Sequence, residues 1–108
     1  MGIESVLKSA GAEGKEKHVP VITVVDDGTV RVVVGDEIEH PNTLEHHIAW
    51  VSLYGVVKGK KLVINLGRTE FAAGYTKPEA VFKVNVADLS KYYAVAYCNL
   101  HGIWESEA

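Results

Sequence analysis

Short runs of β-branched residues, separated by glycine, proline and polar turns, make up most of this chain of 108 residues. Such runs between such breaks are typical of β-strands. Asp26-Asp27-Gly28 adds a hairpin signal in which Gly28 is expected to supply a positive φ. We expect strands over residues 19–25, 29–34, 46–57, 61–66, 68–72, 79–86 and 92–97.

This spacing predicts an all-β fold, an immunoglobulin-like antiparallel β-sandwich or barrel of about seven strands. Gly55 is expected to interrupt the long strand and Gly67 to separate two short ones. Residues 3–9 predict a short N-terminal helical turn. The chain is expected to be one domain over residues 1–108, with residues 1–15 as an N-terminal extension or loop.

Charge and composition exclude several classes of protein. Lys and Arg number 11 and Asp and Glu 14, so the net charge is −3 and neither nucleic acid nor an acidic membrane is an expected partner. We find no signal peptide and no apolar run long enough to span a membrane, and we expect a cytoplasmic protein. The single cysteine, Cys98, forms no internal disulfide, which suits a reducing compartment or a metal site.

All five histidines and the one cysteine fall in three short segments, residues 16–20, 40–47 and 98–102. Each segment lies at a strand end or in a loop, where β scaffolds commonly place sites. Cys98 and His101 could bind one ion from a single turn, with Gly102 allowing a backbone shape that other residues disfavour. A thiolate with several imidazoles suits iron, copper or zinc rather than Ca²⁺ or Mg²⁺.

His46 and His47 are adjacent, so in an extended strand they point to opposite faces and at most one of them is expected to be a ligand. Hydrophobic periodicity does not choose between the two, because each shares its parity with apolar residues of the following strand.

Together these segments resemble the superoxide reductases, in the small one-iron form often called neelaredoxin. The resemblance rests on the Glu-Lys-His-Val-Pro run at 16–20, the His-Pro-Asn to Glu-His-His run at 40–47 and the Cys-Asn-Leu-His-Gly run at 98–102. It extends from about residue 15 over nearly all of the chain, through the β-rich stretches between the motifs.

The resemblance implies one non-haem iron, held by four histidine nitrogens in a plane and an axial cysteine sulfur. Matched motif by motif, the metal ligands are His18, His40, His46, His101 and Cys98. His47 is then a structural residue near the site. Relatives with a four-Cys iron module need more cysteines than the one present here. Amide N–H groups of residues 99–101 are expected to donate to the sulfur.

The reaction implied is superoxide plus one electron and two protons giving hydrogen peroxide, without dioxygen. Two further residues match family positions with catalytic roles. Lys17 is expected to attract the superoxide anion, and Glu16 to bind ferric iron after product leaves. The family implies an external electron donor, usually rubredoxin, and a homo-oligomer, most often a homotetramer.

Three other readings fit parts of the sequence. A blue-copper electron carrier is also a small β-sandwich, but it uses two histidines and one cysteine, commonly with an axial methionine, and the only methionine here is Met1. A zinc-stabilised β module needs only four of the donors. A plain immunoglobulin-like interaction domain would use Trp50 and Trp104 as core anchors. Metal analysis with an optical spectrum separates these readings.

Overall fold

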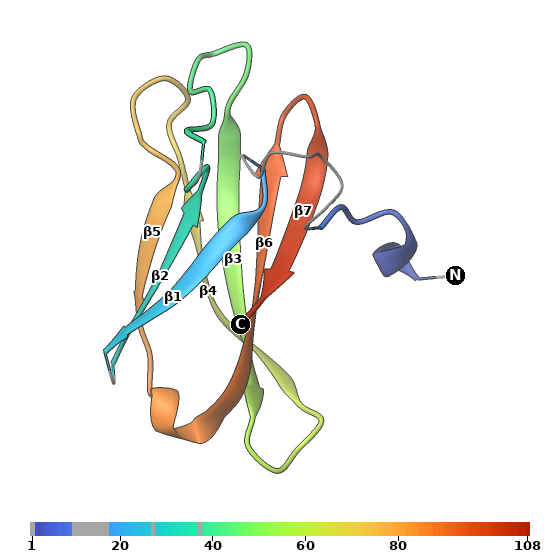
Figure 1. Ribbon diagram of the computed structural model, residues 1–108, viewed down its shortest axis with the longest axis vertical. Coiled ribbons are helices and arrows are strands. Elements are labelled where there is room, and N and C mark those ends of the chain that lie inside the picture. The colour runs from blue at the N-terminus through green and yellow to red at the C-terminus, as the bar shows by residue number, and fades with distance from the viewer. Residues whose placement is uncertain (1, 10–17, 27, 37) are drawn as a thin grey trace.

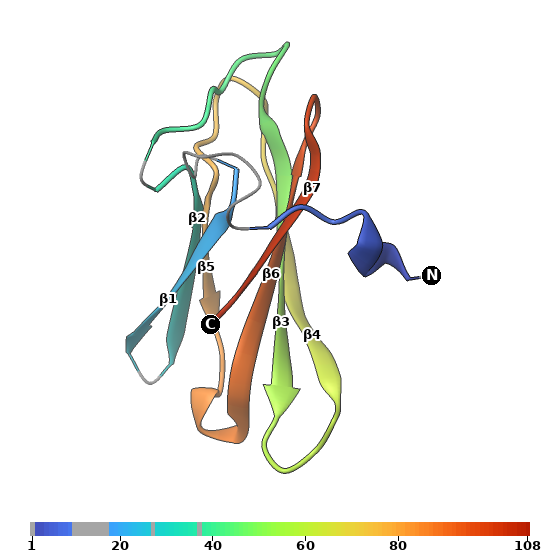
Figure 2. The same ribbon diagram turned by 45° about the vertical axis from the view of Figure 1, so that its right-hand side comes forward.

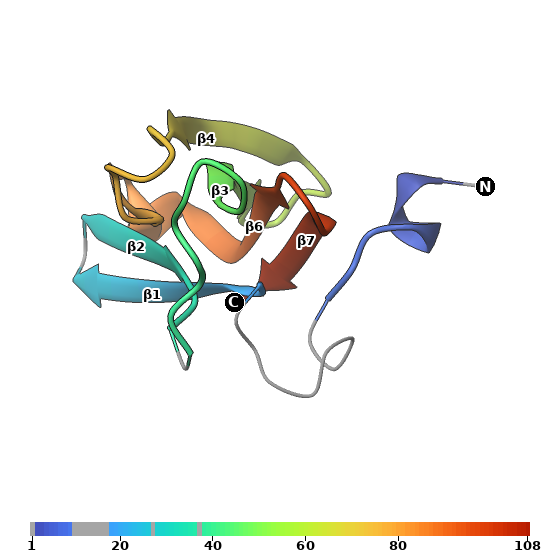
Figure 3. The ribbon, with the colours of Figure 1, turned by 90° about the horizontal axis from the view of Figure 1, so that it is seen from above.

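Seven antiparallel strands form two facing sheets in the computed structural model, which describes residues 2–9, 18–26, 28–36 and 38–108. The order is β1-β2-β5 in one sheet and β4-β3-β6-β7 in the other. Figure 1 shows the elements and Figure 3, seen from above, shows the two layers. Their bounds are η1 Ile3–Ser5, β1 Pro20–Asp26, β2 Thr29–Val34, β3 Ile48–Val57, β4 Val63–Glu70, β5 Glu79–Lys83, η2 Val86–Asp88, β6 Leu89–Cys98 and β7 Gly102–Glu107.

The core lies between the sheets because alternate residues of the central strands point inward. In β6 the inward set is buried, while the residues between them are partly exposed. In β5 Val81 and Lys83 are exposed, whereas Ala80 and Phe82 between the exposed residues are buried. The inner face comprises Val30, Val32, Val34, Ile48, Val51, Leu53, Ala80, Phe82, Leu89, Tyr92, Ala94, Ala96 and Cys98.

The predicted all-β sandwich is confirmed, but two glycine assignments were wrong. β3 runs through Gly55, where an added Cβ would lie 3.0 Å from Leu89, so this glycine allows close packing rather than a break. β4 runs through Gly67 as one strand, beside a register shift that absorbs it. β7 was missed, because its sequence lacks a run of β-branched residues. The expected number of strands was therefore right although two elements were misplaced.

The predicted β1–β2 hairpin is confirmed, with Asp26 paired to Thr29. The φ of Gly28 depends on residue 27, which lies outside the described residues, so the expected positive φ stays a prediction. The backbone N–H of Gly28 donates to Asp26 Oδ1 at 2.8 Å. This hydrogen bond holds the pKa of the Asp26 carboxyl below its ordinary value, because it stabilises the charged form.

The N-terminal turn is confirmed as the 3₁₀ turn η1, shorter than predicted. After it, Lys8 joins β7 through a parallel bridge to Trp104. Most of the expected extension, from residue 10 on, lies outside the described residues. No helix in the described part of the chain is long and apolar enough to cross a membrane.

Gly35 lets the chain turn sharply after β2. Its φ is +87°, and an added Cβ would lie 2.4 Å from the backbone nitrogen of His40 and 2.9 Å from the carbonyl oxygen of Ile38. The segment that follows β2 is thus folded back directly over this glycine, which fixes where His40 lies.

We predict that Gly35→Ala lowers the free energy of unfolding more than Gly59→Ala does. Gly59 has a similar φ of +72° with nothing within 4 Å of an added Cβ, so both variants share a backbone strain of roughly 1–2 kcal/mol. Only Gly35→Ala must also displace backbone, which adds about 1–3 kcal/mol. Equilibrium urea unfolding of both variants measures the difference, and equal losses would contradict the steric role of Gly35.

Candidate metal centre

Three segments that are distant in sequence meet at one end of the sandwich. His18 lies just before β1, His40 and His46 lie between β2 and β3, and the third segment joins β6 to β7. Figures 1 and 2 show these connections together at the upper end of the sheets. The sequence motifs therefore converge because the antiparallel strands return them to the same edge.

Four side chains there form a compact cluster of possible metal donors. One nitrogen each of His18, His40 and His46 and the sulfur of Cys98 all lie within 4.8 Å of one another. His18, His40 and Cys98 are buried and His46 is half-buried. Buried imidazoles beside a thiol form a donor set that suits a transition metal rather than Ca²⁺ or Mg²⁺.

The four imidazole rings stand at the corners of an approximate square. Successive centroid distances around it are 4.7 Å from His18 to His40, 4.8 Å to His46, 4.9 Å to His101 and 4.8 Å back to His18. The diagonal from His18 to His46 is longer, at 6.2 Å. Neighbouring rings are inclined by 65° to 75°, so the rings surround one common space.

His101 reaches this space from an exposed position. Its Nδ1 lies 3.1 Å from Nε2 of His18 and 3.7 Å from Sγ of Cys98. The short Cys98–His101 connection ends at Gly102, whose φ of +85° is the backbone shape expected from the sequence. Five potential donor atoms thus come together, four imidazole nitrogens and one sulfur.

The hydrogen bond at His40 indicates which of its nitrogens faces the cluster. Its Nδ1 lies 2.7 Å from the carbonyl oxygen of Pro41, and since a carbonyl only accepts, Nδ1 carries the hydrogen. Nε2 is then the nitrogen with a lone pair for a metal. A hydrogen bond from the ring nitrogen that does not bind the metal is the usual way that proteins orient a ligating histidine.

Trp104 supports two of the histidines, a role that the sequence did not indicate. Its ring stacks on His18, with centroids 4.8 Å apart and planes 13° apart, and its Nε1 donates to the carbonyl of His101 at 3.2 Å. Nζ of Lys8 donates to the same carbonyl at 3.0 Å. The tryptophan is only three residues from His101 along the chain, whereas nothing in the sequence links Lys8 to it.

Asn99 links the segment 98–102 to the segment 40–47 through hydrogen bonds. Its side-chain oxygen accepts from the N–H of His47 at 2.8 Å, and its side-chain nitrogen donates to the carbonyl of Glu45 at 2.9 Å. Its own backbone N–H donates to the His47 carbonyl at 3.2 Å. That N–H is therefore engaged away from Cys98, which corrects the expectation that it serves the sulfur.

His47 stands outside the donor cluster. Its Nδ1 donates to the carbonyl of Thr43 at 3.1 Å, which makes it part of the loop's own structure. The parity argument did not decide between His46 and His47, because β3 begins only at Ile48 and neither residue is in a strand. Glu16 and Lys17 lie outside the described residues, so their expected roles stay predictions.

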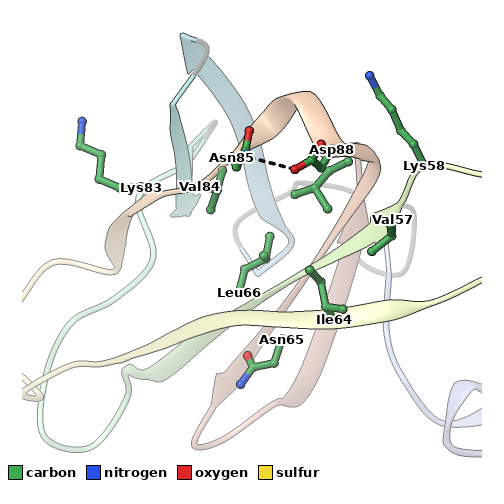
Figure 4. A pocket seen from close by; sticks show the side chains of 10 residues that line it. Val57, Lys58, Ile64, Asn65, Leu66, Lys83, Val84, Asn85 and Asp88 are labelled. Atoms are coloured by element: carbon green, nitrogen blue, oxygen red, sulfur yellow. Dashed lines mark hydrogen bonds between the residues drawn. The ribbon is translucent and has the colours of Figure 1, made fainter. Parts of the chain in front are cut away.

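A second concave feature lies at the opposite end of the sandwich. A cavity of about 600 Å³ is lined by apolar side chains of Val57, Ile64, Leu66 and Leu89, with Asn85 and Asp88 beside them. Figure 4 shows these residues and the hydrogen bond from Asn85 to Asp88. Because β3 and β6 run the full length of the sheet, this cavity is separate from the histidine cluster.

Comparison with known proteins agrees with this geometry. Residues 10–107 match the Desulfoferrodoxin family. The chain is 45% identical to a superoxide reductase of Pyrococcus horikoshii over 97% of this chain and 96% of that protein. It is 36% identical to a neelaredoxin of Megalodesulfovibrio gigas, covering 84% of each.

Solved structures show the same fold. A crystal structure of superoxide reductase in the oxidised state aligns with a TM-score of 0.87 and 41% identity over 99% of this chain and 98% of the other. A superoxide reductase (neelaredoxin) of Archaeoglobus fulgidus in the reduced form gives 0.84 and 43% over 94% and 95%. From its sequence, its two-sheet fold and its histidine-cysteine cluster, the chain belongs to the superoxide reductase family, in its one-iron neelaredoxin type.

Proposed function

We propose that His18, His40, His46, His101 and Cys98 hold one iron ion, and that the chain reduces superoxide to hydrogen peroxide there. The observation that carries this proposal is the square of four imidazole rings beside a buried thiol. A blue-copper site would use two imidazoles and leave the other two without a role, and tetrahedral zinc would leave one.

When bound, ferrous iron supplies the single electron that, with two protons, converts superoxide to hydrogen peroxide. The protein's part is to hold five donors in place and to leave one side accessible. Cys98 and His40 form the buried floor of the cluster, whereas His46 is half-buried and His101 exposed. We therefore expect superoxide, protons and product to pass on the side of His46 and His101.

Lys17, the residue before His18, is proposed to attract superoxide. The substrate is an anion and the chain carries a net charge of −3, so its overall charge does not favour the encounter. Charges further away than roughly 8 Å are largely screened at physiological salt, so a nearby cation has to supply the attraction. Glu16, one residue earlier, is proposed to bind the ferric ion once product has left.

The electron consumed in each turnover has to come from outside, because the cluster is the only group of redox-suited ligands in the described residues. We propose a small donor protein, rubredoxin by family likeness. Leu44 and Leu100 are exposed in the two ligand loops and would give such a donor an apolar contact near the centre. A homotetramer and a cytoplasmic location remain proposals from the same likeness.

The iron content of two variants distinguishes the roles of the adjacent residues His46 and His47. We predict that His46→Ala loses most of the iron, because it removes one donor of the cluster, while His47→Ala keeps about one iron per chain and the visible thiolate-to-iron absorption. Metal analysis and an optical spectrum of the oxidised protein measure both properties. A colourless wild-type protein that holds zinc, or equal iron loss in the two variants, would refute the assignment.

Removing the charge of Lys17 should slow the reaction. We predict that Lys17→Ala lowers the second-order rate constant with superoxide roughly tenfold at low salt and weakens its dependence on ionic strength. Lys60→Ala, in an exposed turn, is the matched control and should leave both unchanged. Pulse radiolysis over a series of salt concentrations gives the rate constants, and identical salt slopes for the wild type and Lys17→Ala would exclude the role.

Glu16→Ala tests whether the carboxylate of Glu16 binds ferric iron. A carboxylate is a hard anionic ligand that favours ferric over ferrous iron, so its loss should shift the ferric absorption band while turnover stays within about twofold. Glu13→Ala, three residues away, serves as the control of equal charge. An unchanged ferric spectrum in Glu16→Ala would show that this carboxylate does not bind the ion.

A further inference from the structure

The turn between Cys98 and Gly102 is held from outside the sandwich by a residue of the N-terminal arm. Nζ of Lys8 donates to the carbonyl oxygen of His101 at 3.0 Å, although the two residues are 93 positions apart in the chain. His101 is the exposed member of the four histidines in the proposed site. The arm therefore contacts the metal centre at the histidine that the core holds least.

The backbone of the arm brings Lys8 to this position. β7 is the edge strand of its sheet, and Figure 1 shows the arm reaching it. The N–H of Lys8 donates to the carbonyl of Ile103 at 3.1 Å, and the N–H of Glu105 donates to the carbonyl of Lys8 at 2.8 Å. These two bonds form the parallel bridge between Lys8 and Trp104. Because its backbone is already fixed, Lys8 loses only side-chain freedom when its ammonium group meets the turn.

His101 is oriented differently from His40. The ring of His40 donates from Nδ1 to a carbonyl, which leaves Nε2 to face the cluster. In His101 it is Nδ1 that lies near His18 and Cys98, and in the described part of the chain no carbonyl or carboxylate accepts a hydrogen bond from its other ring nitrogen. The backbone carbonyl of His101 instead accepts two hydrogen bonds, from Lys8 and from Nε1 of Trp104. His101 is thus oriented through its backbone rather than through its ring.

The same ammonium group is also close to the support of a second histidine. Nζ of Lys8 lies 5.4 Å from the centre of the Trp104 ring, a distance at which a cation is attracted to an aromatic face. Trp104 is only 3% exposed and stacks on His18. One positive charge therefore contacts both groups through which this side of the centre is held.

We propose that Lys8 is a positioning residue of the metal centre, and that its positive charge raises the reduction potential of the bound iron. This inference rests on the proposed function, in which His101 is a ligand. A hydrogen bond from a charged donor keeps the turn, and with it the imidazole, in the binding position. A cation beside the turn also disfavours the additional positive charge of ferric iron, and so favours the ferrous ion that supplies the electron.

Replacing Lys8 by methionine tests both effects, because it removes the ammonium group and keeps an unbranched apolar side chain. In iron-loaded Lys8→Met we expect ferrous iron to be released to an excess of chelator about fivefold faster, since the turn loses a charge-assisted hydrogen bond. We expect the ferric-to-ferrous ratio at a given potential to rise about threefold, which lowers the reduction potential by ~30 mV. Lys8→Arg keeps a charged donor and should restore both values.

Lys91→Met is the matched control. Nζ of Lys91 also lies near an aromatic ring, 5.8 Å from the centre of Tyr93, and forms an ion pair with Glu107. It stands near the start of β6, whereas Cys98 ends that strand, so it is far from the metal centre. The release rate and the potential of Lys91→Met should equal those of the wild type. Far-UV circular dichroism of all three variants reports whether each is folded.

Three results would overturn the proposal. They are an unchanged release rate and potential in Lys8→Met, an equal change in Lys91→Met, and a failure of Lys8→Arg to restore the wild-type values. Release of cobalt(II), whose absorption reports thiolate binding, separates this inference from the proposed function. A wild type that binds no iron would refute the proposed function alone, if cobalt(II) still leaves Lys8→Met faster than it leaves the wild type. Iron bound equally firmly by the wild type and Lys8→Met would refute the role of Lys8 alone.

Discussion

The pairing of β3 with β6 is the constraint on which the metal centre depends. Its register places Ile48 opposite Cys98 at the end of the sheet, so His46, just before β3, lies beside the thiol. The tight connection to β7 then returns His101 to the same place. A slip of one residue would turn Cys98 to the outer face and Tyr97 to the core, so the buried alternation of β6 also determines which side chain reaches the metal centre.

The other two histidines come from the opposite sheet. His18 precedes β1 and His40 follows β2, and the pairing of Pro20 with Val34 keeps these two strand ends together. A metal bound by all four imidazoles therefore joins the two sheets. Because the bound metal favours only the closed sandwich, its binding free energy adds to the stability of the fold. The stacking of Trp104 on His18 and the hydrogen bonds of Asn99 bring the same segments together before the metal is present.

Sequence patterns predicted the features that depend on neighbouring residues. They did not predict the features that depend on contacts between residues far apart in the chain. The Val-rich strands and the position of the donors were predictable, since alternation and motif order are local properties. Gly67 was predicted to break the strand, but β4 continues through it with one extra residue, Leu66, which a register shift against β3 accommodates. Alternation could not separate His46 from His47, because β3 begins only at Ile48 and neither histidine lies in a strand; the resemblance of the motif assigned His46, which is the one in the donor cluster. The contacts of Lys8 and Asn99 with segments far along the chain leave no local signal at all.

Adjacent residues of β6 serve two surfaces of one strand. Cys98 ends the inward set and lies in the donor cluster, whereas Tyr97 is on the opposite face of the strand and stacks on Trp50 with centroids 5.9 Å apart. A substitution at Trp50 or Tyr97 can therefore disturb the register of β3 with β6 and displace the neighbouring Cys98 thiol, although neither side chain touches the metal centre.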